Sequence, residues 1–141
     1  MVSDWWLVGS LGWAGAHMAD KLRSVEELDV WKVAMEMVTG VYAVTRDWPA
    51  EERFGLTNQV RRAAVSVPSN IAEGQGRANS REFLHFLAIA NGSLQEVRTQ
   101  LRIGANLNYL SKDDLRSMLD LSDSCGRLLS GLRRAIRKRT D

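Results

Sequence analysis

Apolar residues recur every three or four positions in four separate stretches of the chain, which is the spacing that buries one side of an α-helix. No stretch alternates apolar and polar residues over a useful length, so the pattern predicts no strand. The first stretch ends before Pro49, because the residue ahead of a proline is disfavoured in a helix. Its apolar stripe comprises Leu28, Trp31, Met35, Val38, Tyr42 and Thr45.

The other three stretches have the same period and are separated by helix start and stop signals. Gly74 and Gly76 end the second, Ser80 is the predicted N-cap of the third, and Ser111 with Asp114 resembles a capping box before the fourth. The second stripe comprises Leu56, Val60, Ala63, Ala64, Val67 and Ile71. The third comprises Phe83, Leu87, Ala90, Leu94, Val97 and Leu101. The fourth comprises Leu115, Met118, Ser122, Cys125, Leu129, Leu132 and Ile136.

Four amphipathic helices joined by short connections bury their stripes most simply in an up-down-up-down antiparallel four-helix bundle. We therefore predict an all-α domain over residues 21–141. Residues 1–20 do not share the helical period, and their apolar run is shorter than the ~20 residues that span a membrane. We interpret residues 1–20 as a non-native or disordered leader and expect no membrane association.

The second predicted helix carries an unusual row of polar residues beside its apolar stripe, as its period of about 100° per residue shows. Two interpretations are open: a buried network that fixes the register of the bundle, or a groove for a ligand or nucleic acid. The row comprises Gln59, Arg62, Ser66, Asn70, Glu73 and Arg77. Val65 and Ala72 lie roughly opposite the row and form a second apolar face, which a neighbouring molecule would cover.

Pro68 lies inside the same predicted helix. It removes one backbone donor and displaces the carbonyl of Ala64, so a kink or a local irregularity is expected there. The side chains of Ser66, Ser69 or Asn70 are placed to compensate by hydrogen bonding to nearby carbonyls.

The net charge of +2 conceals an uneven distribution. From Arg127 onward the sequence has six basic residues and one acidic residue, Asp141. This end therefore carries a net charge of +5, and the rest of the chain carries −3. Such asymmetry is typical of a protein that binds a polyanionic partner, although cations also stabilise the C-terminus of any helix. The predicted nucleic-acid-binding residues are Arg127, Arg133, Arg134, Arg137, Lys138 and Arg139.

Residues for catalysis or metal binding are sparse. The two histidines, His17 and His85, and the single cysteine, Cys125, form no recognisable metal cluster, and no phosphate-binding loop is present. Ser66 and Ser93 lack a recognisable base that would activate them. We predict a protein that is not an enzyme and has no catalytic residue, metal or cofactor, with Cys125 as a core thiol.

Three segments carry a family resemblance: LTNQVRRAAVSVPSNIAEGQGR, EFLHFLAIANGSLQEVRTQL and NYL. They resemble the bacterial proteins encoded by 23S rRNA intervening sequences, and the likeness runs from about Leu28 to about Ile136. The resemblance implies a four-helix bundle that assembles as a ring-like homopentamer in the cytoplasm, with no established enzymatic activity. A distant relative, the accessory protein of diversity-generating retroelements, is a basic pentameric barrel that binds nucleic acid and a reverse transcriptase, but it offers only an analogy.

Two functions follow as hypotheses. The first is nucleic-acid binding, of RNA or DNA, through the basic C-terminal helix of an oligomer. The second is a protein–protein scaffold or accessory subunit, such as a partner of a reverse transcriptase, in which Val65 and Ala72 form the subunit contact. An enzyme built on the polar row of the second helix is the third, and least supported, alternative.

Overall fold

The structure, a computed structural model, describes residues 25–140. The predicted leader, residues 1–20, lies outside the described residues and stays a prediction. Within residues 25–140 the chain forms four long α-helices and one short 3₁₀ helix, with no strand. The elements are α2 (Val25–Val44), η1 (Ala50–Glu52), α3 (Leu56–Gln75), α4 (Ser80–Asn106) and α5 (Lys112–Thr140).

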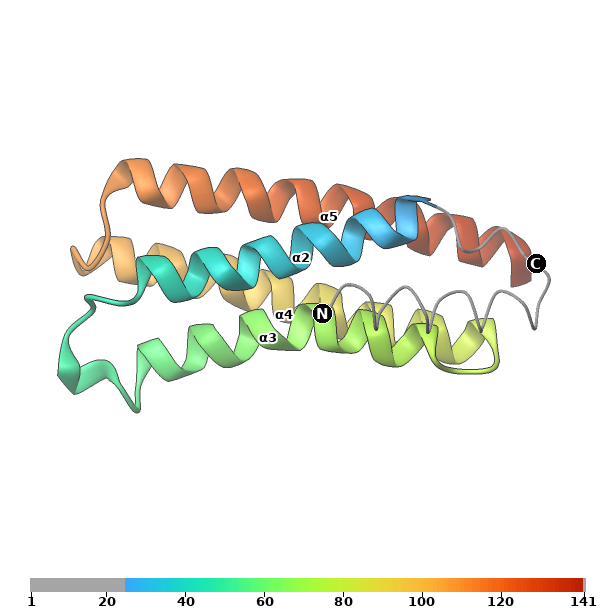
Figure 1. Cartoon of the computed structure of the whole chain (residues 1–141), viewed down its shortest axis with the longest axis horizontal. Coiled ribbons are helices and arrows are strands. Elements are labelled where there is room, and N and C mark those ends of the chain that lie inside the picture. Colours follow the sequence, from blue (N-terminus) through green and yellow to red (C-terminus); the bar gives the residue numbers. More distant parts are fainter. Residues whose placement is uncertain (1–24, 141) are drawn as a thin grey trace.

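The four helices lie side by side, and consecutive helices run in opposite directions (Figure 1). Each packs against two others, in the closed order α2, α3, α4, α5 and back to α2, and the backbones of the two diagonal pairs do not approach so closely within the described part. The predicted four-helix bundle is confirmed.

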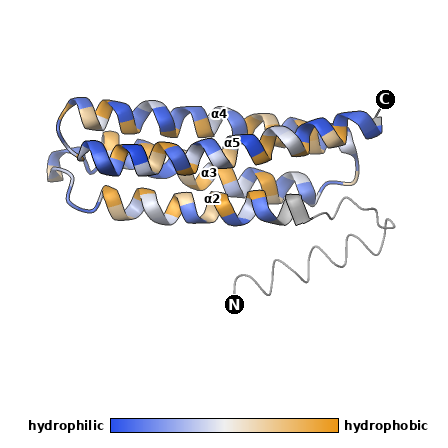
Figure 2. Ribbon diagram, turned by 90° about the horizontal axis from the view of Figure 1, so that it is seen from above, coloured by the Kyte–Doolittle hydropathy of each residue, from blue (hydrophilic) through white to orange (hydrophobic). Residues whose placement is uncertain are grey.

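The core is made by one stripe from each helix, and the stripes predicted for α3, α4 and α5 are confirmed, although Leu56 and Leu115 at two ends are only partly buried. Figure 2 shows apolar residues recurring between polar ones along every helix. Burial of one such side chain stabilises the fold by about 1.5–3 kcal/mol. Fully buried large residues include Val60, Ile71, Leu87, Leu94, Leu101, Leu129, Leu132 and Ile136.

The predicted stripe of α2 was wrong in part. Trp31 and Thr45 are buried as expected, but Tyr42 is 43% exposed and Met35 and Val38 are only partly buried. The fully buried stripe is Val30, Ala34, Met37 and Val41. Helix α2 carries apolar residues on nearly every side, so its period alone did not decide which of two adjacent stripes faces α3 and α5.

The helix ends follow side-chain chemistry. Asn79, and not the predicted Ser80, caps α4: its Oδ1 accepts a hydrogen bond from the backbone N–H of Glu82 at 2.8 Å. Asparagine suits this position because its side chain reaches the free amides of the first turn from an extended backbone. The predicted cap of α5 is present, since Ser111 Oγ accepts from the N–H of Asp114 at 3.0 Å.

Helix α3 continues through Pro68, which is buried. Two carbonyls in the turn before Pro68 gain side-chain donors, as predicted. Ser69 Oγ donates to the carbonyl of Val65 at 2.7 Å, and Asn70 Nδ2 donates to the carbonyl of Ser66 at 2.8 Å. These bonds supply local support where the proline removes one.

One end of the bundle is closed around Trp48, in the connection between α2 and α3. Its ring is buried against Gly104 of α4, where a Cβ atom would lie 2.6 Å from it, and its centroid is 5.5 Å from that of Tyr109. The Tyr109 hydroxyl donates to Glu52 Oε2 at 2.9 Å, and this hydrogen bond raises the pKa of Tyr109. Glu52 Oε1 accepts from the N–H of Leu56 at 2.9 Å, which ties two connections to the start of α3.

Cys125 is fully buried in α5, and burial raises the pKa of its thiol from the ordinary value of 9.0 to about 12. We expect the native protein to react with DTNB at pH 8 far more slowly than the unfolded protein does.

Because the pKa of Cys125 is higher in the folded state than in the unfolded state, the protonated thiol stabilises the fold fully below pH 9, and this contribution is lost as pH rises toward 12. Urea unfolding between pH 8 and 11 should show a steeper loss of stability than in the Cys125→Ala variant. Parallel curves would contradict the expectation.

Candidate nucleic-acid interface

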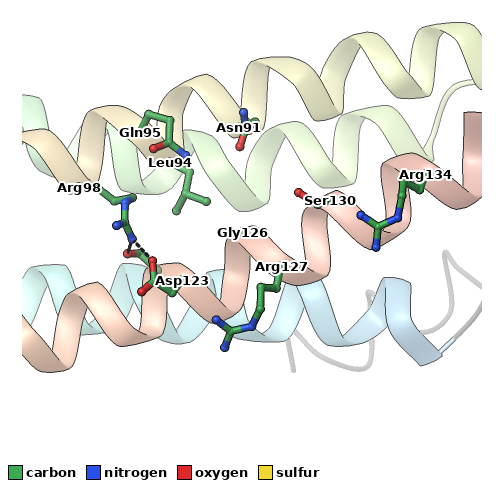
Figure 3. A pocket seen from close by; sticks show the side chains of 10 residues that line it. Asn91, Leu94, Gln95, Arg98, Asp123, Gly126, Arg127, Ser130 and Arg134 are labelled. Carbon is green, nitrogen blue, oxygen red and sulfur yellow. Dashed lines mark hydrogen bonds and ion pairs between the residues drawn. The ribbon is translucent and has the colours of Figure 1, made fainter.

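A polar groove of about 550 Å³ lies between α4 and α5 on the outside of the bundle (Figure 3). We call it the α4–α5 groove. It contains part of the predicted basic cluster together with residues that the sequence analysis did not select. Its walls comprise Asn91, Leu94, Gln95, Arg98, Ser122, Asp123, Gly126, Arg127, Ser130 and Arg134.

The groove follows from the helical spacing of its polar residues. Asn91, Gln95 and Arg98 recur at steps of four and three on α4, which places them on one face beside the core stripe. Arg127, Ser130 and Arg134 recur in the same way on α5. Because α4 and α5 pack together, the two polar faces meet along the same groove.

Arg98 is held in place by its partners on α5. Its guanidinium forms an ion pair with Asp123 and donates to Ser122 Oγ at 2.7 Å, and Ser122 is buried. The Asp123 carboxylate therefore offsets the charge of Arg98. Figure 3 shows this pair at one end of the groove.

Arg127 and Arg134 supply the net positive charge of the α4–α5 groove, because Asp123 is the only acid in its walls. Both are exposed. Among the described residues, Arg127 Nη2 donates to Ser124 Oγ alone, at 3.2 Å, and Arg134 has no partner. Two guanidiniums without carboxylate partners are suited to contact phosphate oxygens.

The other predicted basic residues do not share this groove. Lys138 is exposed and lies near the face of the two groove arginines, at about 100° per residue. Arg133 is half-buried, and its Nε is buried without a hydrogen bond to the described residues. Arg137 and Arg139 are exposed and each already has an interaction partner. The cluster that is compact in sequence is thus divided over several sides of α5.

Four residues of the groove were not predicted from the sequence: Asn91, Gln95, Arg98 and Ser130. The signal was present as a second, polar period on α4 and α5 that runs parallel to the apolar one. It was overlooked because these residues are uncharged or, like Arg98, lie far from the C-terminal cluster in sequence.

The polar row of α3 divides into two parts, and the first is a network between helices. Ser66 Oγ lies 2.7 Å from Ser93 Oγ of α4, and Asn70 Nδ2 donates to Ser66 Oγ at 2.9 Å. Ser93 is buried, so these polar groups satisfy one another where water has little access. This geometry favours the first interpretation of the row, a network that fixes α3 against α4.

The second part of the row is exposed. Glu73 and Arg77 form an ion pair at 2.6 Å, and the Arg77 guanidinium lies 4.9 Å from the centroid of the Phe86 ring. Gln59 and Arg62 border a hollow of about 350 Å³ between α3 and α4. An exposed ion pair contributes little to stability, about 0–1 kcal/mol.

We expect Asn70→Ala to lower the free energy of unfolding by about 1–2 kcal/mol, because Asn70 bonds both the hydroxyl and the carbonyl of Ser66 in a half-buried setting. Urea unfolding monitored by circular dichroism measures this. The control is Ser69→Ala on the exposed side of the same turn, expected to change stability by less than about 0.5 kcal/mol. Equal effects of the two substitutions would show that the network has no special role.

The described residues contain no group of three or more His, Cys, Asp or Glu residues placed to hold a metal ion. In residues 25–140 no helix is both long and apolar enough to cross a membrane.

Comparisons with known proteins agree with this fold. A family model for the 23S rRNA-intervening sequence protein matches residues 26–131. Among solved structures, the chain is similar to a protein with unknown function from the S23 ribosomal protein family of Bacteroides thetaiotaomicron. That structure has a TM-score of 0.71 and 19% identity, over 78% of this chain and 99% of that chain, so the likeness concerns the fold alone. No curated protein matches the chain.

Proposed function

Since the chain belongs to the 23S rRNA-intervening sequence protein family, we propose that it is a non-enzymatic, self-associating four-helix bundle that binds RNA along the α4–α5 groove. The observation that carries this proposal is the pair Arg127 and Arg134, exposed in one groove without carboxylate partners in residues 25–140. A groove with two such arginines is suited to bind the phosphate backbone of RNA, which carries one negative charge per nucleotide.

The neutral residues of the groove define the mode of binding. Asn91, Gln95 and Ser130 offer hydrogen-bonding groups to sugars and phosphates without adding charge. Contacts to the backbone fix position and do not read sequence. We therefore propose binding that depends on the shape and charge of the RNA.

We further propose that copies of the chain assemble into a ring-like homopentamer through the outer side of α3. Val65 is 41% exposed there, and Ala72 is partly exposed on the same face. Ile89 and Ile103 add exposed apolar surface on α4. Apolar side chains exposed on the outer sides of α3 and α4 favour a protein contact, and rotational symmetry would repeat the groove in every subunit. Light scattering should give about five times the subunit mass.

A salt titration tests the RNA proposal. Fluorescence anisotropy with a labelled structured RNA should show an affinity that falls steeply as salt rises, because each phosphate contact releases a bound counterion. The same RNA with an excess of unlabelled heparin should be displaced. An affinity that stays constant from low to high salt would contradict binding through Arg127 and Arg134.

A protein scaffold is the alternative function, and exposed Ile103 and Leu107 near the end of α4 favour it. On this alternative the nuclease-treated protein binds a defined protein partner with an affinity that changes little with salt. The salt dependence of binding therefore separates the two proposals.

A further inference from the structure

A second basic cavity, of about 500 Å³, lies between α2 and α3, on helices that do not line the α4–α5 groove. Three arginines contribute to its walls: Arg53 from the connection before α3, and Arg61 and Arg62 from α3. No acidic residue is part of the walls. We call this cavity the arginine pocket. Three like charges beside one cavity raise its positive potential, which attracts an anion.

Arg61 is the rigid member of the pocket. Its Nε donates to Thr45 Oγ1 at 2.9 Å, and its guanidinium lies 4.5 Å from the centroid of the Tyr42 ring. Thr45 is itself buried and donates to the carbonyl of Val41 at 2.7 Å. The two terminal nitrogens of Arg61 make no hydrogen bond within the described part of the chain. These two nitrogens are thus held in place and their N–H groups are available to donate hydrogen bonds to a ligand.

Arg53 and Arg62 are the adaptable members. Both are exposed, and Arg62 has no partner among residues 25–140. Among the described residues, the Arg53 guanidinium interacts only with the neighbouring Phe54 ring, whose centroid lies 5.9 Å away. Neither charge is offset by a carboxylate, so both can turn toward an anion at the cost of side-chain entropy alone.

The start of α3 adds neutral donors to the same wall. The first amides of a helix lack partners inside the helix, and Glu52 occupies only that of Leu56. Thr57 lines the pocket, is 8% exposed, and its hydroxyl is buried without a hydrogen bond to any described residue. Glu52 is not among the wall residues of the pocket. Its two carboxylate oxygens already accept hydrogen bonds from Leu56 and Tyr109. The pocket therefore lies beside helix amides that Glu52 does not occupy.

We propose that the arginine pocket binds a phosphate dianion, either free or as the monoester of a small molecule. Guanidinium groups match the oxygens of phosphate in pairs, which favours phosphate over a single-charged anion. The cavity volume is in the range of small-molecule sites, and Tyr42, about two-fifths exposed, offers ring surface to an organic part. This site is independent of RNA binding in the α4–α5 groove.

Isothermal titration calorimetry of the full chain in low-salt buffer tests the pocket with inorganic phosphate, AMP and adenosine. Phosphate and AMP should bind, and adenosine should not. A tighter affinity for AMP identifies the monoester as the ligand, whereas equal affinities identify free phosphate. Absence of binding by both phosphates at about 10 mM, which lies beyond ordinary millimolar affinities, would overturn the proposal.

Variants locate the site. Arg62→Gln should weaken phosphate binding about tenfold, and Arg53→Gln should weaken it by a smaller factor, because each removes one charged donor. The matched control is Arg116→Gln, an exposed arginine at the start of α5, which should bind as the parent does. Equal losses in Arg62→Gln and Arg116→Gln would show a nonspecific charge effect and overturn the assignment. Circular dichroism confirms that each variant is folded.

The two basic sites are tested separately. Replacing Arg127 and Arg134 with glutamine should leave phosphate binding unchanged, so failure of the RNA proposal does not decide the fate of the pocket. Loss of RNA affinity in Arg62→Gln, without binding of either phosphate to the parent, would assign these arginines to RNA and overturn the small-molecule proposal.

Discussion

Replacing both Arg127 and Arg134 with glutamine should weaken RNA binding about tenfold or more at moderate salt. Both side chains are exposed in the α4–α5 groove and no carboxylate of the described residues pairs with them, so their full charge is available to phosphates. Each lost phosphate contact should also reduce the slope of log affinity against log salt by about one, so the double variant should lose about two. In an oligomer the loss is repeated in every subunit.

Fluorescence anisotropy with one labelled RNA at several salt concentrations measures both quantities. Arg116→Gln with Lys112→Gln is the matched control, since it removes two exposed charges from the other end of the same helix. This control should keep the salt slope of the parent within about half a unit. If the control and the groove variant lose affinity equally, the α4–α5 groove is not the RNA site.

Gly104→Ala should lower the free energy of unfolding by about 1–3 kcal/mol, as overpacking of a core does. A Cβ atom at this position would lie 2.6 Å from the buried ring of Trp48, which is closer than two carbon atoms approach. Alanine is the better helix former by about 1 kcal/mol, so the clash must exceed that gain. Denaturant unfolding measures the balance of the two effects.

Gly92→Ala is the matched control, because Gly92 lies in the same helix with no atom within 4 Å of its Cβ position. It should stabilise the protein by up to about 1 kcal/mol through helix propensity. In a double-mutant cycle, Trp48→Leu should remove much of the penalty of Gly104→Ala, since the clashing ring is gone. A Gly104→Ala variant as stable as Gly92→Ala would show that Trp48 shifts at no cost.

The fold was predictable because α3, α4 and α5 each carry one continuous apolar stripe. Leu87, Leu94 and Leu101 repeat at steps of seven, and only one face of a helix can bury such a set. Helix α2 was harder, because Val41 and Tyr42 are neighbours in an apolar segment and the packing of α3 and α5 selects Val41. Local capping was also decided by geometry, since Asn79 and Ser80 are both good cap residues.

The candidate sites were less predictable. The basic C-terminal cluster was visible as a run of charge, but the run did not show that Arg127 and Arg134 alone would share a groove with Arg98. The arginine pocket joins Arg53 to Arg61 and Arg62 across a turn of the chain, and its rigidity depends on Thr45 and Tyr42 of α2. Such groupings arise from tertiary packing, which the period of a single helix does not predict.

The closed order of packing, α2 to α3 to α4 to α5 and back to α2, distributes the entropy of chain closure unevenly. Three of the interfaces join consecutive helices, and each requires only a short connection to close. The interface between α2 and α5 instead closes a loop that contains both of the other helices. Because this cost grows only logarithmically, by about 0.6 kcal/mol per doubling of loop length, one distant contact between chain ends completes a domain whose other contacts are local.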